Sequence, residues 1–303
     1  MTLTQLKYII TVAEEKSMNE AAKRLFISQP SLSSAIKDIE EEIGFHVFKR
    51  SNKGVIVTSE GEEFIGYARQ VVEQYTLLET KYIEKERVKK KFGVSTQHYT
   101  FAVNAFIEMV KQFGMEEYEF AIRETKTYEI IEDVKNFKSE IGILYLNEFN
   151  RNVLTKLFAE CGLEFHPILD CHIYAYIWKG HPLATRKEIA LEELEDYPCL
   201  SFEQGNNNSF YFAEEVLSTY HYKQLIKAND RATMLNLMVG LNGYTLCSGI
   251  ICEDLNGSDY CAVKLKSDET MTIGYLSRKG VTMSILGQIY IDELTKYKEK
   301  ALR

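Results

Sequence analysis

Four consecutive hydrogen-bonding side chains, Ser95, Thr96, Gln97 and His98, stand between an apolar run and a helical pattern. The apolar run, FGVST, is typical of a buried strand. Free backbone N–H groups at a helix N-terminus attract anions, and hydroxyl and amide side chains add further donors. The segment therefore predicts a site for a carboxylate or a sulfate. Plain N-capping by Ser95 or Thr96 is the alternative explanation of the same residues.

A second polar loop precedes another helical pattern and carries Glu203, Asn206 and Asn207. Its side chains could face the first loop across a cleft, with the carboxylate of Glu203 meeting an amine. An ordinary surface turn is the alternative. Three weaker candidates for the same site are Thr125 and Thr127, which follow the strand-like run YEFAIRE, and Tyr145 at the end of the run EIGILYL.

The sequence gives no support for catalysis. The motifs G-x-S-x-G, G-x-x-x-x-G-K-[ST], G-x-G-x-x-G and H-E-x-x-H do not occur, and the six histidines are scattered without the spacing of metal ligands. Cys171 and His172 are neighbours, but adjacent residues on a strand point to opposite faces and cannot form a dyad. We therefore predict that the protein is not an enzyme and needs no cofactor and no metal.

A helical hairpin over residues 17–37 is the second feature with chemical potential. Ser17 and Glu20 fit an S-x-x-E capping box, and Ser28 can cap the next helix, which has Pro30 in its first turn.

The second helix of this hairpin has one apolar stripe and one polar stripe. Leu32, Ile36, Ile39 and Ile43 recur at helical spacing and should face a core. The other face carries small hydrogen-bonding side chains and a lysine. The small side chains suit contacts with base edges in the major groove, and the lysine suits a phosphate. We predict DNA contacts from Gln29, Pro30, Ser33, Ser34 and Lys37. A helical hairpin with a serine-rich surface is the alternative.

The next segment, HVFKRSNKGVIVTSEG, predicts a two-stranded wing around the turn Asn52-Lys53-Gly54. The wing would carry Arg50 and Lys53 to the phosphates beside the groove.

The helical hairpin and the wing resemble the N-terminal part of the LysR-type transcriptional regulators. The resemblance extends to the box TSEG at 58–61, the strand ending in STQH, and the stretches SEIGILYL, KGHPLA and DRATMLNLMVGLNGYTL. The resemblance implies an α/β protein with an N-terminal winged helix-turn-helix, a long linker helix and a two-lobed, periplasmic-binding-protein-like effector domain. It implies three kinds of partner: operator DNA, a small carboxylate-bearing effector, and further copies of the chain in a dimer or tetramer. RNA polymerase is a further candidate partner. Within the family the chain resembles a Gram-positive subgroup tied to sulphur amino acid (methionine and cysteine) metabolism.

We expect the domain boundaries to follow that plan. The expected parts are the winged helix-turn-helix at 1–58, the linker helix at 59–88 and the effector domain at 89–303, with lobe 1 at about 89–162 and 266–303 and lobe 2 at about 163–265. Strand-like runs alternate with helical patterns in the effector domain, which favours parallel sheets covered by helices on both faces. The expected helices lie near 98–113, 127–137, 152–161, 208–220, 231–241 and 283–299.

The linker helix carries an apolar seam that repeats every 3.5 residues, the spacing that two packed helices require. The seam comprises Phe64, Ala68, Val71, Tyr75, Leu78 and Tyr82. It predicts a homodimer, and a helix that lies on its own domain is the alternative.

Composition is compatible with a DNA-binding protein once the charge is divided along the chain. The net charge is −8, but residues 1–91 hold 15 Lys and Arg against 14 Asp and Glu, so the acidic excess belongs to the remainder. The six cysteines form no C-x-x-C pair and predict reduced thiols, with a metal site or redox switch as the alternative. No run approaches the ~20 apolar residues of a membrane span, and the first residues do not look like a signal peptide. We expect a cytoplasmic protein.

Three functional classes stay open at this point. We favour a DNA-binding regulator whose operator binding is modulated by a small anionic or zwitterionic metabolite, controlling genes of amino acid metabolism or transport. A small-molecule-binding module and an enzyme with an unfamiliar site are the alternatives.

Overall fold

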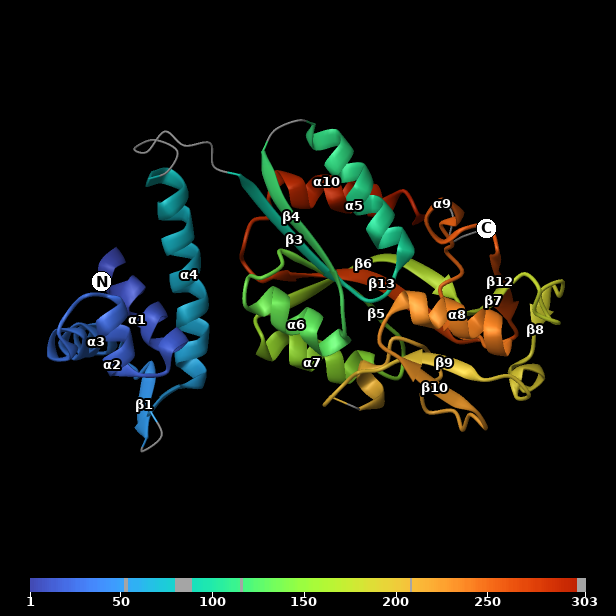
Figure 1. Cartoon of the computed structure of the whole chain (residues 1–303), viewed down its shortest axis with the longest axis horizontal. Coiled ribbons are helices and arrows are strands. Elements are labelled where there is room, and N and C mark those ends of the chain that lie inside the picture. The colour runs from blue at the N-terminus through green and yellow to red at the C-terminus, as the bar shows by residue number, and fades with distance from the viewer. Residues whose placement is uncertain (52–53, 80–88, 115–116, 208, 299–303) are drawn as a thin grey trace. The chain divides into compact units, whose positions relative to one another are not determined.

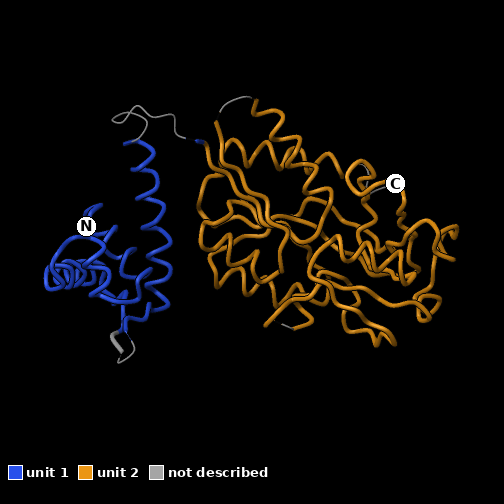
Figure 2. The backbone as a smooth tube through the Cα atoms, viewed as in Figure 1, with its two compact units in different colours: residues 1–89 blue, residues 90–303 orange. Residues whose placement is uncertain are grey.

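The computed structural model describes residues 1–51, 54–79, 89–114, 117–207 and 209–298. The chain divides into two compact units, Met1–Lys89 and Lys90–Arg303 (Figure 2). Each unit has its own apolar core, and we describe each by itself.

The first unit begins with three short helices, α1 (Leu3–Glu15), α2 (Met18–Arg24) and α3 (Gln29–Ile43). The Ser28 hydroxyl accepts the Ser31 N–H at 3.2 Å and fixes the start of α3. Gly44 ends α3 with a φ of 83°, a left-handed conformation that favours glycine. Only half of the expected capping box forms on α2, because the Ser17 hydroxyl accepts the Glu20 N–H while the Glu20 carboxylate pairs with Lys23.

The predicted stripe on α3 is confirmed. Leu32, Ile36 and Ile39 are buried together with residues of α1 and of α4, and Ile43 packs against the same cluster. Two strands follow, β1 (Phe48–Ser51) and β2 (Gly54–Val57), which pair antiparallel as the predicted wing.

The predicted seam of the linker helix α4 (Ser59–Glu79) is partly buried and partly exposed. Ala68 is buried in the first unit's own core and Phe64 packs at its edge, as the alternative interpretation expected. Val71, Tyr75 and Leu78 are exposed. The predicted seam residue Tyr82 and the remainder of the expected helix to 88 lie outside the described residues.

The first lobe of the second unit is built on a five-stranded sheet in the order β4-β3-β5-β13-β6. Its strands are β3 (Lys90–Thr96), β4 (Tyr118–Glu124), β5 (Ile141–Leu146), β6 (Leu163–His172) and β13 (Thr270–Arg278). Helices α5 (Thr100–Phe113) and α10 (Ile285–Thr295) cover one face, and α6 (Thr127–Lys135) and α7 (Arg151–Glu160) cover the other (Figure 1). A separate apolar core fills each face.

The second lobe is built on a four-stranded sheet in the order β11-β7-β12-β8 and a parallel pair, β9 with β10. Its elements are β7 (Tyr174–Trp178), β8 (Glu188–Ile189), β9 (Cys199–Phe202), β10 (Leu225–Ala228), α8 (Arg231–Leu241), β11 (Thr245–Cys247), α9 (Glu253–Asn256) and β12 (Tyr260–Leu265). Short 3-10 turns occur at Leu191–Leu194 and Phe210–Phe212.

Three expectations about the second unit were wrong. The chain does not leave the first lobe near residue 163, because β6 pairs with β13 as far as His172. Both β5 and β6 run antiparallel to β13, so the first sheet is mixed rather than parallel. The described part of 208–220 contains a single 3-10 turn in place of a helix.

No helix among the described residues is long and apolar enough to cross a membrane.

Candidate functional site

The outward face of α3 carries the predicted recognition residues. Pro30, Ser34 and Lys37 are exposed, while Ser33 is half-buried and its hydroxyl accepts a hydrogen bond from Gln29 Nε2 at 2.9 Å. A small hydroxyl and a long cation one turn apart on an exposed helix face leave room for close approach to a groove. The helix thus exposes Pro30, Ser34 and Lys37 on the side opposite its buried stripe, while Gln29 and Ser33 are partly buried beside them.

Acidic residues at the far end of α3 are neutralised within the first unit. Glu40 accepts the Val47 N–H at 2.8 Å and the Phe48 N–H at 3.0 Å, so its carboxylate anchors the start of the wing to α3. Glu41 pairs with Lys37 at 3.2 Å, and Glu42 pairs with the N-terminal amine. These contacts compensate part of the negative charge at this end of α3.

The structure does not describe the two wing side chains that we predict to contact phosphates. Arg50 pairs in register with Val55, but its side chain is outside the described part of the structure, as is the whole of Lys53. Their predicted DNA contacts therefore stay predictions.

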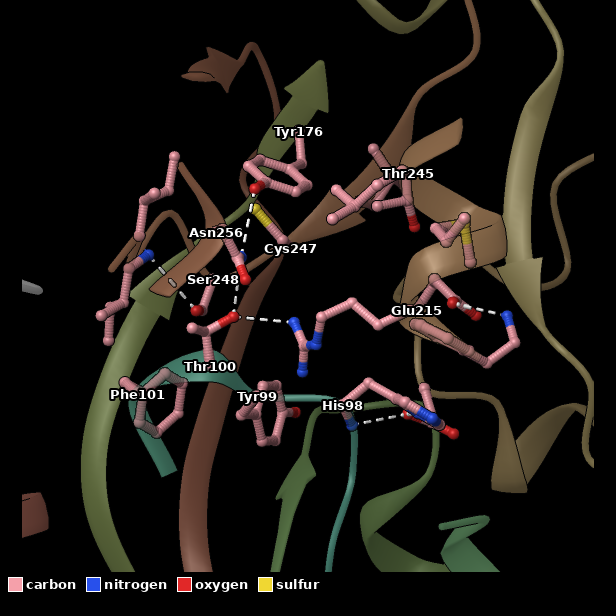
Figure 3. Close-up of a pocket in the computed structure, with 18 of the residues that line it drawn as sticks. His98, Tyr99, Thr100, Phe101, Tyr176, Glu215, Thr245, Cys247, Ser248 and Asn256 are labelled. Carbon is pink, nitrogen blue, oxygen red and sulfur yellow. Dashed lines mark hydrogen bonds and ion pairs between the residues drawn. The ribbon is translucent and has the colours of Figure 1, made fainter. Parts of the chain in front are cut away.

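A cavity of about 80 Å³ lies in the second unit and draws on both lobes (Figure 3). Its polar end is organised around the Thr100 hydroxyl at the start of α5, which accepts Arg231 Nη1 at 2.7 Å and Asn256 Nδ2 at 2.9 Å. Asn256 Nδ2 also donates to the Tyr176 hydroxyl at 3.3 Å. Arg231 makes an ion pair with Glu124 at the end of β4.

The rest of the cavity wall is largely apolar. Methionines supply a flexible, polarizable surface that adapts to unbranched chains, and three of them, Met234, Met238 and Met271, line the cavity. At about 80 Å³ the cavity is small. The arrangement suits a compact molecule with one anionic end and an apolar tail.

Arg231 owes its position to the start of α8. Asp230 is the N-cap of that helix, where its carboxylate accepts the Thr233 N–H at 2.8 Å and the Thr233 hydroxyl at 2.7 Å. These two hydrogen bonds hold the pKa of Asp230 below its usual value. With the N-cap satisfied by Asp230, the Arg231 guanidinium lines the cavity and donates to the Thr100 hydroxyl.

Two neighbouring acids reach the cavity from the second lobe. The Glu214 carboxylate accepts hydrogen bonds from the His98 N–H at 3.0 Å, from His98 Nδ1 at 2.8 Å and from Gln204 Nε2 at 3.0 Å. Glu215 Oε1 accepts the Phe202 N–H at 2.9 Å. Burial, with a smaller contribution from Glu214, raises the pKa of Glu215 well above its usual value.

Of the four residues in the first predicted loop, only His98 lines this cavity. Ser95 donates to Asp133 at 2.6 Å and lies 2.8 Å from the Ser139 hydroxyl, and the Thr96 hydroxyl donates to the Gln97 carbonyl. Both side chains are fully buried among protein groups.

The Gln97 side chain also bonds to groups of the protein. Its Nε2 donates to the Thr127 hydroxyl at 2.6 Å, and its Oε1 accepts the Tyr99 hydroxyl and the Tyr145 N–H. The Tyr145 hydroxyl donates to the Ala213 carbonyl at 3.2 Å, which ties the first lobe to the second. Tyr145 therefore acts in the joint between the lobes, whereas the hydrogen-bond partners of Gln97 belong to the first lobe.

The second predicted loop lines a different hollow. Asn206 and Asn207 lie there with Lys126 and Glu129, and the Thr125 hydroxyl donates to Glu129. The Glu203 N–H donates to the Ala228 carbonyl, and the carboxylate of Glu203 is not on the cavity wall. The predicted side chains of the two loops thus line different hollows.

The sequence analysis missed Arg231, Thr100 and Asn256. An N-cap aspartate followed at once by an arginine, Asp230-Arg231, was the available signal for a cation at the start of a helix.

The cysteines have the properties of packed thiols. Burial raises the pKa of Cys171, Cys199 and Cys247 to about 12, and it raises the pKa of Cys161 and Cys261 more modestly. A reactive thiol needs the opposite shift. Among the described residues no group of His, Cys, Asp and Glu side chains could hold a metal ion.

Comparisons with known proteins match both units to family models. Residues 3–62 match "Bacterial regulatory helix-turn-helix protein, lysR family", and residues 99–297 match "LysR substrate binding domain". The chain is 30% identical over 207 residues to the HTH-type transcriptional regulator AlsR of Bacillus subtilis, a match that covers 66% of this chain and 64% of that protein. It is 28% identical to CysL of the same organism, over 71% of this chain and 69% of the relative.

A solved structure shares the fold over nearly the whole length. Full-length OxyR C199D from Pseudomonas aeruginosa superposes with a TM-score of 0.63 at 21% sequence identity, covering 97% of this chain and 98% of that one.

Proposed function

The chain belongs to the LysR family of bacterial regulators, and on that premise we propose that it is a DNA-binding transcriptional regulator whose operator binding is modulated by a small anionic or zwitterionic metabolite. The exposed face of α3 carries the DNA-binding part of this proposal, because Ser34 and Lys37 lie opposite the buried stripe at the start of a capped helix.

We propose a homodimer joined through the second half of α4. Val71, Tyr75 and Leu78 leave an apolar row exposed in the single chain, and they follow the 3.5-residue spacing of a two-helix seam. Such a dimer would set two copies of α3 for two half-sites of an operator. Association into a tetramer through the second unit is a further proposal that follows the family plan.

We propose that the effector binds in the cavity at Arg231. A guanidinium can hold a carboxylate by two parallel hydrogen bonds, and Thr100 and Asn256 supply further polar groups beside it. An amine on the ligand would meet Glu215 on the same wall, where a cation would favour the ionised carboxylate. The methionine-lined wall suits an unbranched or thioether tail.

These features favour a small amino acid or an acylated or sulphur-containing derivative. Control of sulphur amino acid metabolism is the corresponding proposal for the pathway, with methionine and O-acetylserine as the first compounds to test.

Calorimetry of the full chain against a panel of amino acids and their acetylated precursors tests this site. Thr100→Val removes the hydroxyl that Arg231 and Asn256 share, and it should weaken binding by about tenfold or more, the loss of one charge-assisted hydrogen bond. Thr96→Val makes the same change at a buried hydroxyl off the cavity wall and is the matched control. Equal weakening by both variants, or no binding of any carboxylate, would contradict the proposed site.

A further inference from the structure

The position just before α5, where the sequence predicts an effector anion, is already occupied by a carboxylate of the chain. Glu214 lies between β9 and β10 in the second lobe, and His98 lies between β3 and α5 in the first. The Glu214 carboxylate accepts the His98 N–H and His98 Nδ1 with one oxygen and Gln204 Nε2 with the other. The carboxylate therefore uses donors from both lobes.

This contact is built into the interior. The side chains of His98 and Glu214 are only 8% and 4% exposed. The His98 ring stacks on Phe202 with ring centroids 3.7 Å apart and planes 3° from parallel, which fixes the ring that donates to Glu214. A buried carboxylate is costly unless its oxygens are satisfied, and here both oxygens accept hydrogen bonds.

Gln204 extends the contact back to the first lobe. Its Nε2 donates to Glu214, and its Oε1 accepts the Thr127 N–H at 3.0 Å at the start of α6. A continuous chain of hydrogen bonds therefore runs from Thr127 through Gln204 and Glu214 to His98. It crosses from the first lobe to the second and returns.

We propose that Glu214 is an internal ligand that takes the place of an effector anion before α5 and holds the two lobes together whether or not an effector is bound. The proposal rests on the effector-binding function proposed above. Because Glu214 occupies the position before α5, the anionic group of the effector binds Arg231 instead.

The arrangement also gives different roles to the contact of Arg231 with Glu124 and the contact of His98 with Glu214. Glu124 pairs with Arg231 at a partly exposed position, so an effector anion that binds Arg231 must compete with Glu124. The Glu214 contact is buried and stays in place. The effector would thus shift the lobes about a joint that remains closed, through its different affinity for the two arrangements.

Amide hydrogen exchange of the full-length protein, with acetate as the probe, tests the role of Glu214. Glu214→Ala removes one methylene and the carboxylate, a fragment the size of acetate, and leaves the donors of His98 and Gln204 in place. We expect the amides of His98 and Thr127 to exchange about tenfold faster or more in this variant, as for one lost charge-assisted hydrogen bond.

Acetate should restore protection at both amides, and chloride at equal ionic strength should not. The thermal midpoint of the variant should also rise by about 3–6 °C at an acetate concentration ten times its dissociation constant, while the wild type stays unchanged. Adding His98→Phe keeps a ring against Phe202 but removes the Nδ1 donor, so it should weaken the acetate effect at least fivefold.

Unchanged protection at Thr127 in Glu214→Ala, or failure of acetate to restore it, would overturn the proposal. If Glu214→Ala does not fold, Glu214→Gln keeps the size of the side chain without its charge. This variant should lose part of the protection without recovering it in acetate, and wild-type protection in it would overturn the proposal equally. Neither readout uses DNA or an effector, so the proposed regulatory function can fail independently.

Discussion

Replacement of Lys37 by alanine tests the DNA-facing role of α3 through the salt dependence of binding. The Lys37 side chain is 75% exposed and its ion-pair partner, Glu41, is 65% exposed. An exposed helical pair of this kind contributes only about 0.3–0.5 kcal/mol, so Lys37 can leave Glu41 for a phosphate at little cost. Each phosphate contact adds about 0.9 to the slope of log K against log salt.

The expected magnitude follows from two copies of α3 on one operator. Two lost contacts should lower the slope by about 1.8, so that between 50 and 200 mM salt the wild type loses roughly tenfold more affinity than Lys37→Ala. Fluorescence anisotropy with a labelled duplex from upstream of the protein's own gene, titrated at several salt concentrations, measures the slope.

Lys156→Ala is the matched control. Lys156 lies on α7 in the second unit, is 80% exposed and pairs with Glu160 at the same i,i+4 spacing. Its removal changes the net charge equally and should leave the slope unchanged. A slope for Lys37→Ala that equals the wild-type value, or an equal change in both variants, would refute the docking of α3.

Three further predictions concern the dimer, a buried acid and the thiols. Tyr75→Asp places a charge in the proposed α4 seam and should convert the dimer to monomer in sedimentation, with at least a tenfold loss of operator affinity; an unchanged dimer would exclude the seam. Because the pKa of Glu215 is raised in the folded protein, protonation of Glu215 favours the folded state, which loses stability as the pH rises. At pH values above about 5, Glu215→Gln should therefore have a higher denaturation midpoint than the wild type. Below about pH 4 the two proteins should have the same midpoint. A wild-type advantage at pH 8 would contradict that sign. With pKa values of about 12, Cys171 and Cys199 should be alkylated roughly a thousandfold more slowly than free cysteine at pH 7.5. Mass spectrometry of native protein treated with iodoacetamide measures this rate. Fast labelling of either thiol would contradict the prediction that these cysteines are packed.

Local signals allowed the first unit to be predicted closely. The Ser28 cap and the stripe from Leu32 to Ile39 are encoded within about one helix length, and both occur as expected. The strand β6 is difficult to recognise in the sequence, because a proline such as Pro167 is unfavourable inside a strand. In the structure, Pro167 pairs with Gly274 at a register shift, an irregularity that accommodates a missing N–H.

The cavity that we propose as the effector site could be predicted only in its general place. Ser95 and Gln97 have the donors that a ligand site needs, but their partners Asp133 and Thr127 come from distant segments and already satisfy them. The position of Arg231 opposite Thr100 depends on how the two lobes close. No local sequence pattern predicts the distance between these two residues.

Coupling between the cavity at Arg231 and operator binding is the central claim, and its direct test is operator affinity measured with and without a carboxylate that calorimetry shows to bind. The ligand should change operator affinity by about 5–150-fold, and operator DNA should change ligand affinity by the same factor. Arg231→Gln should abolish the effect, and Arg186→Gln, at an exposed arginine in the same lobe, should preserve it. A ligand that binds at Arg231 and leaves operator affinity unchanged would contradict the account.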